Sequence, residues 1–252
     1  INDASERNVF LGNETDHIHI DGVSRNNHIA GNYIGVASDG IAPPASPDDA
    51  DVIGVHLDGP DVERNLIGVC PIEPACVFLG SGTGTFENSE LYRNVISRNS
   101  IGVQISGGAF DNRVAGNFVG TDRAAATDTL LGNGIGVLVK DSPSNIIGGV
   151  TGLSTQGCAG DCNVISGNGT GVRIEGVLAE QNRVLGNFIG TTGDRRARLP
   201  NHGDGIEIAG APNNTIGGTL ESGFNIIAGN DGRGIRIDGQ AATGNVVQGN
   251  FI

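Results

Sequence analysis

The feature that most constrains the fold of this chain is a repeat built from three short runs of alternating apolar residues. One copy spans residues 171–190 and has the sequence GVRIEGVLAEQNRVLGNFIG. In its first run Val172 and Ile174 fall on one face while Arg173 and Glu175 fall on the other, and this period of two predicts a β-strand. Strands this short form no stable sheet alone, so each copy needs other copies above and below it.

Seven copies of this unit follow one another along the chain. The first run recurs at 17–22, 54–59, 102–107, 136–141, 171–176, 205–210 and 234–239. The second run begins each time at an asparagine, namely Asn27, Asn65, Asn112, Asn145, Asn182, Asn214 and Asn245. The third run alternates between an aromatic form, at Tyr33, Phe118, Phe188 and Phe251, and an Asn-Val-Ile-like form, at Asn8, Asn94, Asn163 and Asn225. Such regular self-similarity indicates a solenoid.

These patterns predict an all-β chain that forms a right-handed three-stranded parallel β-helix. We expect about seven coils paired into two-coil repeats, with coils about 4.8 Å apart and a rod about 34 Å long. Val172, Ile174, Val184 and Ile189 are expected to point inward and to form columns of like residues. Stacked asparagines can hydrogen-bond along the rod, and the aromatic column is expected to be a buried stack at a corner.

The phrases GNFIGT, NNTIGG and NVISGN resemble those of pectate-lyase-like right-handed parallel β-helix proteins. They are especially similar to the Asn/Gly-rich repeats of large secreted bacterial surface proteins, and the resemblance covers essentially the whole chain. It implies the solenoid fold. It selects no activity, because the same solenoid carries lyases, hydrolases, epimerases, adhesins and inert spacers.

Net charge limits the partners of the protein. The 252 residues carry a formal charge of −13, which disfavours nucleic acid and anionic membranes because a phosphate backbone attracts a basic stripe. No apolar run approaches the length needed for membrane insertion. The unbroken repeat predicts a single domain over 1–252. Because it stops within a motif and shows no polar cap, we expect this domain to be a fragment of a longer chain.

The four cysteines form two local pairs at the same place in the repeat, Cys70 with Cys76 and Cys158 with Cys162. We predict one disulfide in each loop, which implies a secreted, cell-surface or periplasmic location. A zinc site made of all four is the alternative, and it is disfavoured because the pairs lie two coils apart and lack Cys-x-x-Cys spacing. Free thiols are the third possibility.

Long loops are predicted at two corners of the coil. One set follows the aromatic third runs, at 36–53, 121–135 and 191–204, and the other follows the second runs of the alternate coils. We interpret them first as solvated turns. The alternative is one wall of a groove for a polysaccharide, with the aspartates of 36–53 able to bind Ca²⁺.

Four of the five histidines lie in the first two coils. Stacking of these coils would place His19 over His56 and Asp21 over Asp58. Imidazoles and carboxylates at about 5 Å spacing could bind a transition metal such as Zn²⁺ or Cu²⁺. The competing interpretation is a polar outer face in which Asp-Gly only turns the corner.

A second charged group is predicted near the C-terminal end, made of Arg173, Glu175, Glu207, Arg236 and Asp238. A lyase that eliminates across an acidic sugar needs an arginine or lysine base near carboxylate-bound Ca²⁺, and these are the right residue types. Alternating charges are also the ordinary way to avoid like-charge repulsion between neighbouring strands. No catalytic signature of the family is found, and tryptophan is absent.

The sequence therefore favours a non-catalytic role. We expect a rigid module of a secreted or surface protein, serving as stalk, adhesin or scaffold, with polysaccharide or other cell-surface components as partners. The second hypothesis is a lyase, hydrolase or epimerase acting on an acidic polysaccharide. The third is a metal-binding periplasmic β-helix.

Overall fold

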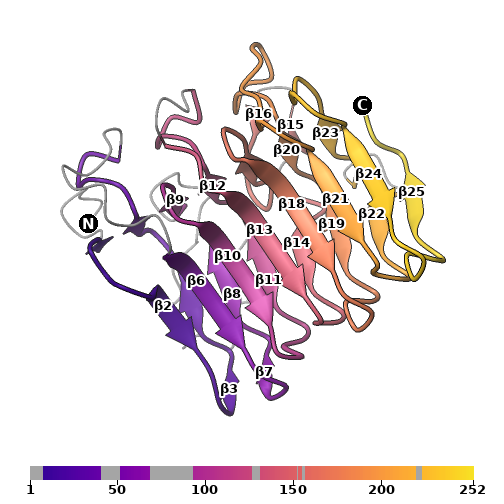
Figure 1. Cartoon of the computed structure of the whole chain (residues 1–252). Helices are drawn as coiled ribbons and strands as arrows, with labels where there is room; N and C mark the ends of the chain where they lie inside the picture. The colour runs from indigo at the N-terminus through magenta and orange to yellow at the C-terminus, as the bar shows by residue number, and fades with distance from the viewer. Residues whose placement is uncertain are drawn as a thin grey trace.

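The computed structural model describes residues 8–40, 52–68, 93–126, 131–151, 153–154, 157–219 and 223–252. Within these ranges the regular structure consists of β-strands, most of them in three seven-stranded sheets. Figure 1 shows the strands lying side by side from the N-terminal to the C-terminal end of the chain.

Each large sheet collects one run of the repeat from every coil. Sheet 1 contains β2 (Asp16–Ile20), β6 (Ile53–Asp58), β10 (Ile101–Ser106), β13 (Ile135–Lys140), β18 (Thr170–Glu175), β21 (Ile206–Ala209) and β24 (Ile235–Asp238). Sheet 2 contains β4 (His28–Ile29), β8 (Leu66–Gly68), β11 (Arg113–Ala115), β14 (Ile146–Gly148), β19 (Arg183–Leu185), β22 (Thr215–Gly217) and β25 (Val246–Gln248). Sheet 3 contains β1 (Val9–Phe10), β5 (Tyr33–Ile34), β9 (Val95–Ile96), β12 (Phe118–Val119), β17 (Val164–Ile165), β20 (Phe188–Ile189) and β23 (Ile226–Ile227).

Every pairing within these three sheets is parallel and joins one coil to the next. In sheet 1, for example, Val55 pairs with Val103, and Val137 pairs with Val172. Two short pairs stand apart: β3 (Ser24–Arg25) lies parallel to β7 (Val62–Glu63), and β15 (Leu153–Ser154) lies antiparallel to β16 (Gly157–Cys158) in a loop. The predicted parallel β-helix with seven coils is confirmed.

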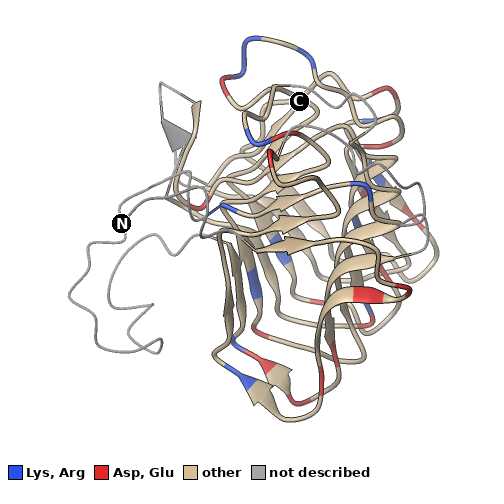
Figure 2. Ribbon diagram, turned by 90° about the vertical axis from the view of Figure 1, so that its left-hand side faces the viewer, with Lys and Arg blue, Asp and Glu red and all other residues tan. Residues whose placement is uncertain are grey.

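The main core lies between the three sheets and is made of aliphatic side chains. Val172, Ile174, Val184 and Ile189 are fully buried there, as the alternating pattern predicts. Only neighbouring coils contribute to each layer, so the core is a stack of similar layers. Figure 2, turned by 90° from Figure 1, shows the coils one behind another, with many charged residues in the loops at the corners.

A second core lies on the outer side of sheet 3. Tyr33, Phe118 and Phe188 are buried there under loop residues that include Leu131 and Cys162. Their neighbours in sequence, such as Ile34 and Ile189, belong instead to the main core, because successive strand residues face opposite sides.

The aromatic side chains of sheet 3 form no continuous stack. Val95 separates Tyr33 from Phe118, and Val164 separates Phe118 from Phe188. Phe251, the last member of the column, is 64% exposed. The aromatic prediction is thus confirmed for burial of the first three members, while the alternation of coil types prevents direct stacking.

Three ladders of asparagine side chains run along the corners of the helix. The first contains Asn8, Asn32, Asn94, Asn117, Asn163, Asn187, Asn225 and Asn250. The second contains Asn27, Asn65, Asn112, Asn145, Asn182, Asn214 and Asn245. The third contains Asn99, Asn133, Asn168, Asn201 and Asn230. Within each ladder, most side chains accept hydrogen bonds from the preceding coil and donate to backbone carbonyls, as Asn117 and Asn163 do, which pairs buried polar groups at the turns.

Candidate functional site

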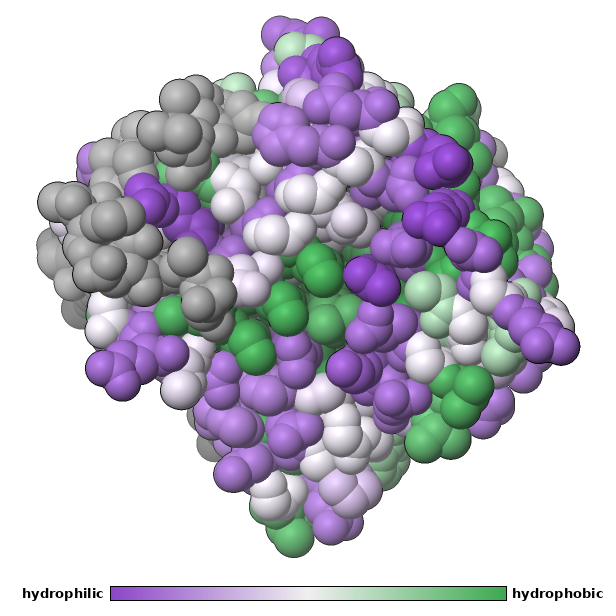
Figure 3. Space-filling view, viewed as in Figure 1, coloured by the Kyte–Doolittle hydropathy of each residue, from purple (hydrophilic) through white to green (hydrophobic). Residues whose placement is uncertain are grey.

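The outward face of sheet 1 carries both groups of candidate residues. Its central row, in register from coil to coil, is His19, His56, Gln104, Leu138, Arg173, Glu207 and Arg236. This confirms the order in which the sequence pattern aligned these residues. In the middle of the row Leu138 is only 5% exposed, and the partly exposed isoleucines 53, 101 and 135 pair with one another at the start of β6, β10 and β13. Figure 3 shows apolar side chains near the middle of this face, with polar ones around them.

A bend in the first strand brings Asp16 onto this face. Asp16 aligns with Ile53, and Ile18 aligns with Val55, which points into the core. Simple alternation would therefore send Asp16 inward as well. In the second coil Gly54 lies between the two positions that align with Asp16 and Ile18. A Cβ added to Gly54 would lie 2.5 Å from Gly102 O and 2.9 Å from core residue Ile96, so this position also faces inward. Two consecutive inward positions interrupt the alternation, and the residue before them faces outward.

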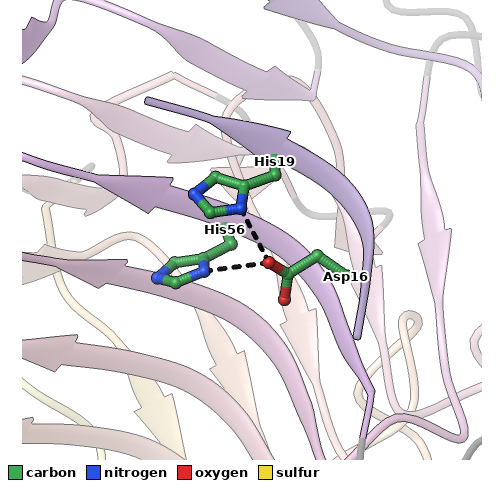
Figure 4. A group of neighbouring side chains, drawn as sticks. All are labelled: Asp16, His19 and His56. Atoms are coloured by element: carbon green, nitrogen blue, oxygen red, sulfur yellow. Dashed lines mark hydrogen bonds and ion pairs between the residues drawn. The ribbon is translucent and has the colours of Figure 1, made fainter. Parts of the chain in front are cut away.

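The resulting group consists of Asp16, His19 and His56 (Figure 4). Both imidazoles direct Nδ1 to the same carboxylate oxygen: Asp16 Oδ2 lies 2.9 Å from His19 Nδ1 and 3.2 Å from His56 Nδ1. The two rings stack with their centroids 4.6 Å apart and their planes inclined by 27°. Side-chain exposure is 41% for His19, 13% for Asp16 and 11% for His56. The group thus has one accessible imidazole and two shielded members.

The other side of the His56 ring contacts a short polar chain. His56 Nε2 lies 2.8 Å from Ser106 Oγ, which donates a 2.7 Å hydrogen bond to Asp58 Oδ1. Asp58 itself is 3.9 Å from His56 Nε2. Gln104 Nε2 also approaches His56 Nε2, at 3.1 Å. Asp58 therefore lies behind the imidazole, on the side away from Asp16.

Within the described residues, Asp21 and His28 do not belong to this group. Asp21 follows the end of β2 and is exposed, and its backbone carbonyl accepts a hydrogen bond from Ser24 Oγ. His28 donates from Nε2 to Gly68 O at 2.6 Å. Burial lowers the pKa of His28 below its ordinary value, and the hydrogen bond to Gly68 opposes that effect. The structure therefore brings together His19 and His56, as predicted, but with Asp16.

The C-terminal charged residues form a chain of ion pairs across β18, β21 and β24. Arg173 Nε lies 2.8 Å from Glu175 and 3.6 Å from Glu207, although its N–H aligns with neither oxygen. Arg236 contacts Glu207 at 3.4 Å and Asp238 at 2.6 Å. The hydrogen bond with Asp238 raises the pKa of Arg236, and the same bond, reinforced by the N–H of Gly239, lowers the pKa of Asp238.

This arrangement opposes general-base chemistry at Arg236. A base must give up its proton near neutral pH, whereas the neighbouring carboxylates hold the guanidinium in its charged form. The residue types predicted for catalysis are therefore adjacent in the structure. They form a set of alternating charges on neighbouring strands of one sheet face.

One of the two predicted disulfides lies in the described residues. Cys158 and Cys162 are bonded, and the loop that contains them is attached to the rod by Arg93, which donates to Cys162 O at 2.9 Å and to Cys158 O at 3.0 Å. The Arg93 guanidinium also lies over the ring of Phe118, 4.9 Å from its centroid. Cys70 and Cys76 lie outside the described residues.

Described portions of the predicted loops cover sheet 3. Val36, Ala125 and Leu131 belong to the outer core over this sheet, which gives these loops a packing role. Most of the aspartates of the 36–53 loop, on which Ca²⁺ binding was predicted, lie outside the described residues.

Sequence reasoning missed Asp16 because it began the first run at His17. The signal in the sequence was the alignment of Asp16 with Ile53, Ile101 and Ile135, because each of these residues comes directly before a copy of the first run.

Comparisons with known protein families, with curated proteins and with solved structures find no match. In the part of the chain that the structure describes, no helix is long and apolar enough to cross a membrane.

Proposed function

We propose that this chain is a non-catalytic, rigid β-helix module of a secreted or cell-surface protein, serving as stalk, adhesin or scaffold. The observation that carries the proposal is the continuity of the asparagine ladders. The ladder through Asn117 and Asn163 joins every coil from Asn8 to Asn250. Buried polar groups that are fully paired along an axis resist bending and opening between coils, because any gap leaves them unsatisfied.

The charged face of sheet 1 supports a structural role. Arg173 and Arg236 are each in contact with two carboxylates, and Lys140 Nζ lies 3.7 Å from Glu175. Opposite charges on adjacent strands stabilise the sheet modestly. An acidic polysaccharide would have to displace these partners before it could bind the arginines.

Two further observations support a location outside the cytoplasm. The Cys158–Cys162 disulfide is typical of proteins from oxidising compartments. The repeat phrases resemble the Asn/Gly-rich, pectate-lyase-like repeats of large secreted surface proteins, in which a solenoid is one segment of a longer polypeptide. In this role the partners are polysaccharides or other cell-surface components.

The alternative is an enzyme that acts on an acidic polysaccharide, and a single set of assays separates it from the module. The protein is incubated with polyuronates, with and without Ca²⁺, and ultraviolet absorbance of unsaturated sugars and new reducing ends are both measured. The proposal expects neither unsaturated sugars nor new reducing ends. Binding of a glycan on an array, without either product, would also agree with the proposal. Turnover that is lost in Arg236→Ala, but kept in the exposed loop variant Arg196→Ala, would favour the enzyme.

Mechanical rigidity is tested by pulling single molecules from both ends. We expect unfolding at high force, in steps that release several coils together, because the coils share continuous ladders and one core. Gradual extension at low force, coil by coil, would contradict the proposal.

A further inference from the structure

We propose that Asp16, His19 and His56 bind one divalent transition-metal ion, of the Zn²⁺ or Cu²⁺ type, which joins the first coil to the second. The inference goes beyond the role of a rigid module and does not depend on it. It rests on the convergence of two imidazole nitrogens and one carboxylate at a single point of the outer face (Figure 4).

The donor atoms fit such an ion in type and spacing. Two histidines and one carboxylate form a recognised ligand set for Zn²⁺, in which water completes the tetrahedron. Donors about 2.0–2.1 Å from a tetrahedral ion lie about 3.3 Å from one another. Asp16 Oδ2 lies 2.9 and 3.2 Å from the two Nδ1 atoms, and all three donors lie within 4.8 Å of one another.

The exposure of the group allows an ion to enter. The side chain of His19 is 41% exposed, so its ring can tilt, and the two planes are already inclined by 27°. Asp16 and His56 are held on the shielded side. An incoming ion replaces the protons that otherwise lie between the carboxylate and the Nδ1 atoms, and solvent can supply its fourth ligand.

The surroundings of His56 provide the outer support that metal-binding histidines usually have. A ligating imidazole normally donates its second N–H to an oxygen that fixes the ring and the tautomer. With an ion on Nδ1, His56 would donate its remaining N–H from Nε2 to Ser106 Oγ, 2.8 Å away, and Ser106 passes its own hydrogen bond to Asp58. This polar chain therefore suits the tautomer in which Nδ1 is the metal ligand. It also gives Asp58, predicted as a ligand from the sequence, a supporting role.

Binding would couple two coils that are distant in sequence. Asp16 and His19 belong to β2, while His56 belongs to β6 and lies 40 residues beyond Asp16. The described residues contain a natural comparison near the other end of the rod, where His202 Nδ1 lies 3.2 Å from Asp231. There a single imidazole shares the carboxylate with Arg198, which makes His202 a matched control.

The test is calorimetric titration of the metal-free full chain with Zn²⁺. We expect one ion per chain with micromolar or tighter affinity. His19→Ala and Asp16→Asn should each weaken binding at least about tenfold, and Ser106→Ala, at a positioning residue, should weaken it by about tenfold. His202→Ala should bind as the wild type does. Circular dichroism of each variant verifies folding, and His19 is chosen over the buried His56 because its removal leaves no cavity.

Cu²⁺ provides a readout that depends on ligand identity. Electron paramagnetic resonance of the Cu²⁺ complex should show coupling to two imidazole nitrogens in the wild type and to one in His19→Ala. The assignment is overturned if folded wild-type protein takes up no Zn²⁺, or if both His19→Ala and Asp16→Asn bind Zn²⁺ as tightly as the wild type.

Discussion

The side-chain amide of Asn117 donates a 3.0 Å hydrogen bond to the side-chain oxygen of Asn163, which lies one coil further along the rod. The backbone N–H of Asn117 donates to the same oxygen at 2.9 Å. Asn163 in turn donates to Asn187 Oδ1 and to the carbonyl of Val114. One buried side chain thus bonds to groups on the coils before and after its own, which links three coils, and the same relationship recurs along the ladder.

Asn163→Ala should destabilise the protein more than an ordinary surface change. The substitution removes the acceptor of the buried Asn117 N–H and side-chain amide and one donor to the Val114 carbonyl, and a buried group left unpaired costs about 1–3 kcal/mol. We expect the free energy of unfolding in urea to fall by about 3 kcal/mol. Asn245→Ala is the control, because this half-buried residue lies in the last coil, where water can replace the lost bonds. Equal losses in the two variants would contradict the ladder's role.

Replacing both Cys158 and Cys162 by alanine should lower stability by about 2 kcal/mol, because a disulfide that closes so short a loop restricts the unfolded chain only modestly. The carbonyls that Arg93 contacts belong to this loop, so the variant should also lose protection of the Arg93 side chain. Urea unfolding measures the first effect and hydrogen exchange near the loop measures the second. The double variant, rather than reductant, is compared with the wild type, since reductant would also break the disulfide predicted between Cys70 and Cys76.

His28 should make stability fall as the pH falls below about 6.5. Burial lowers the pKa of His28 in the folded protein, whereas the unfolded side chain titrates near 6.5. The unfolded state therefore takes up a proton first, and its population rises as the pH decreases. Urea unfolding between pH 7.5 and 5.5 should show a steeper decline for the wild type than for His28→Gln. Parallel declines in the two proteins would exclude His28 as the cause.

Gly136→Ala should be strongly destabilising because neighbouring coils approach closely there. A Cβ at this position would lie 2.6 Å from the carbonyl oxygen of Gly171 and 2.9 Å from Ile165. Forced overpacking of this kind costs about 1–3 kcal/mol. Gly210→Ala serves as the comparison, because its φ is +64° but no atom lies within 4 Å of the added Cβ, so it should cost only about 1–2 kcal/mol of backbone strain. Thermal unfolding of the two variants tests this order.

Much of the architecture could be predicted because a solenoid repeats its local rules. Val172 and Ile174 alternate with Arg173 and Glu175, and the structure buries the first pair in the core as expected. The coil-to-coil register followed from aligning the repeats, so the stacking of His19 on His56 was correctly predicted. The third asparagine ladder, from Asn99 to Asn230, was missed because its members lie in connecting turns of variable length.

The parallel β-helix and the order of residues on its outer face follow from the amino-acid pattern alone, because a strand period of two and a repeated coil length leave few other ways to bury the aliphatic residues. Which carboxylate meets the two histidines became visible in the folded chain. Alternation through β2 would place Asp16 on the same face as Ile18, yet Asp16 Oδ2 lies within 3.2 Å of both imidazoles on the outer face. The chain turns at this corner, where the neighbouring coil lies so close to Gly54 that an added Cβ would be 2.5 Å from Gly102 O, and a strand period of two does not describe such a turn.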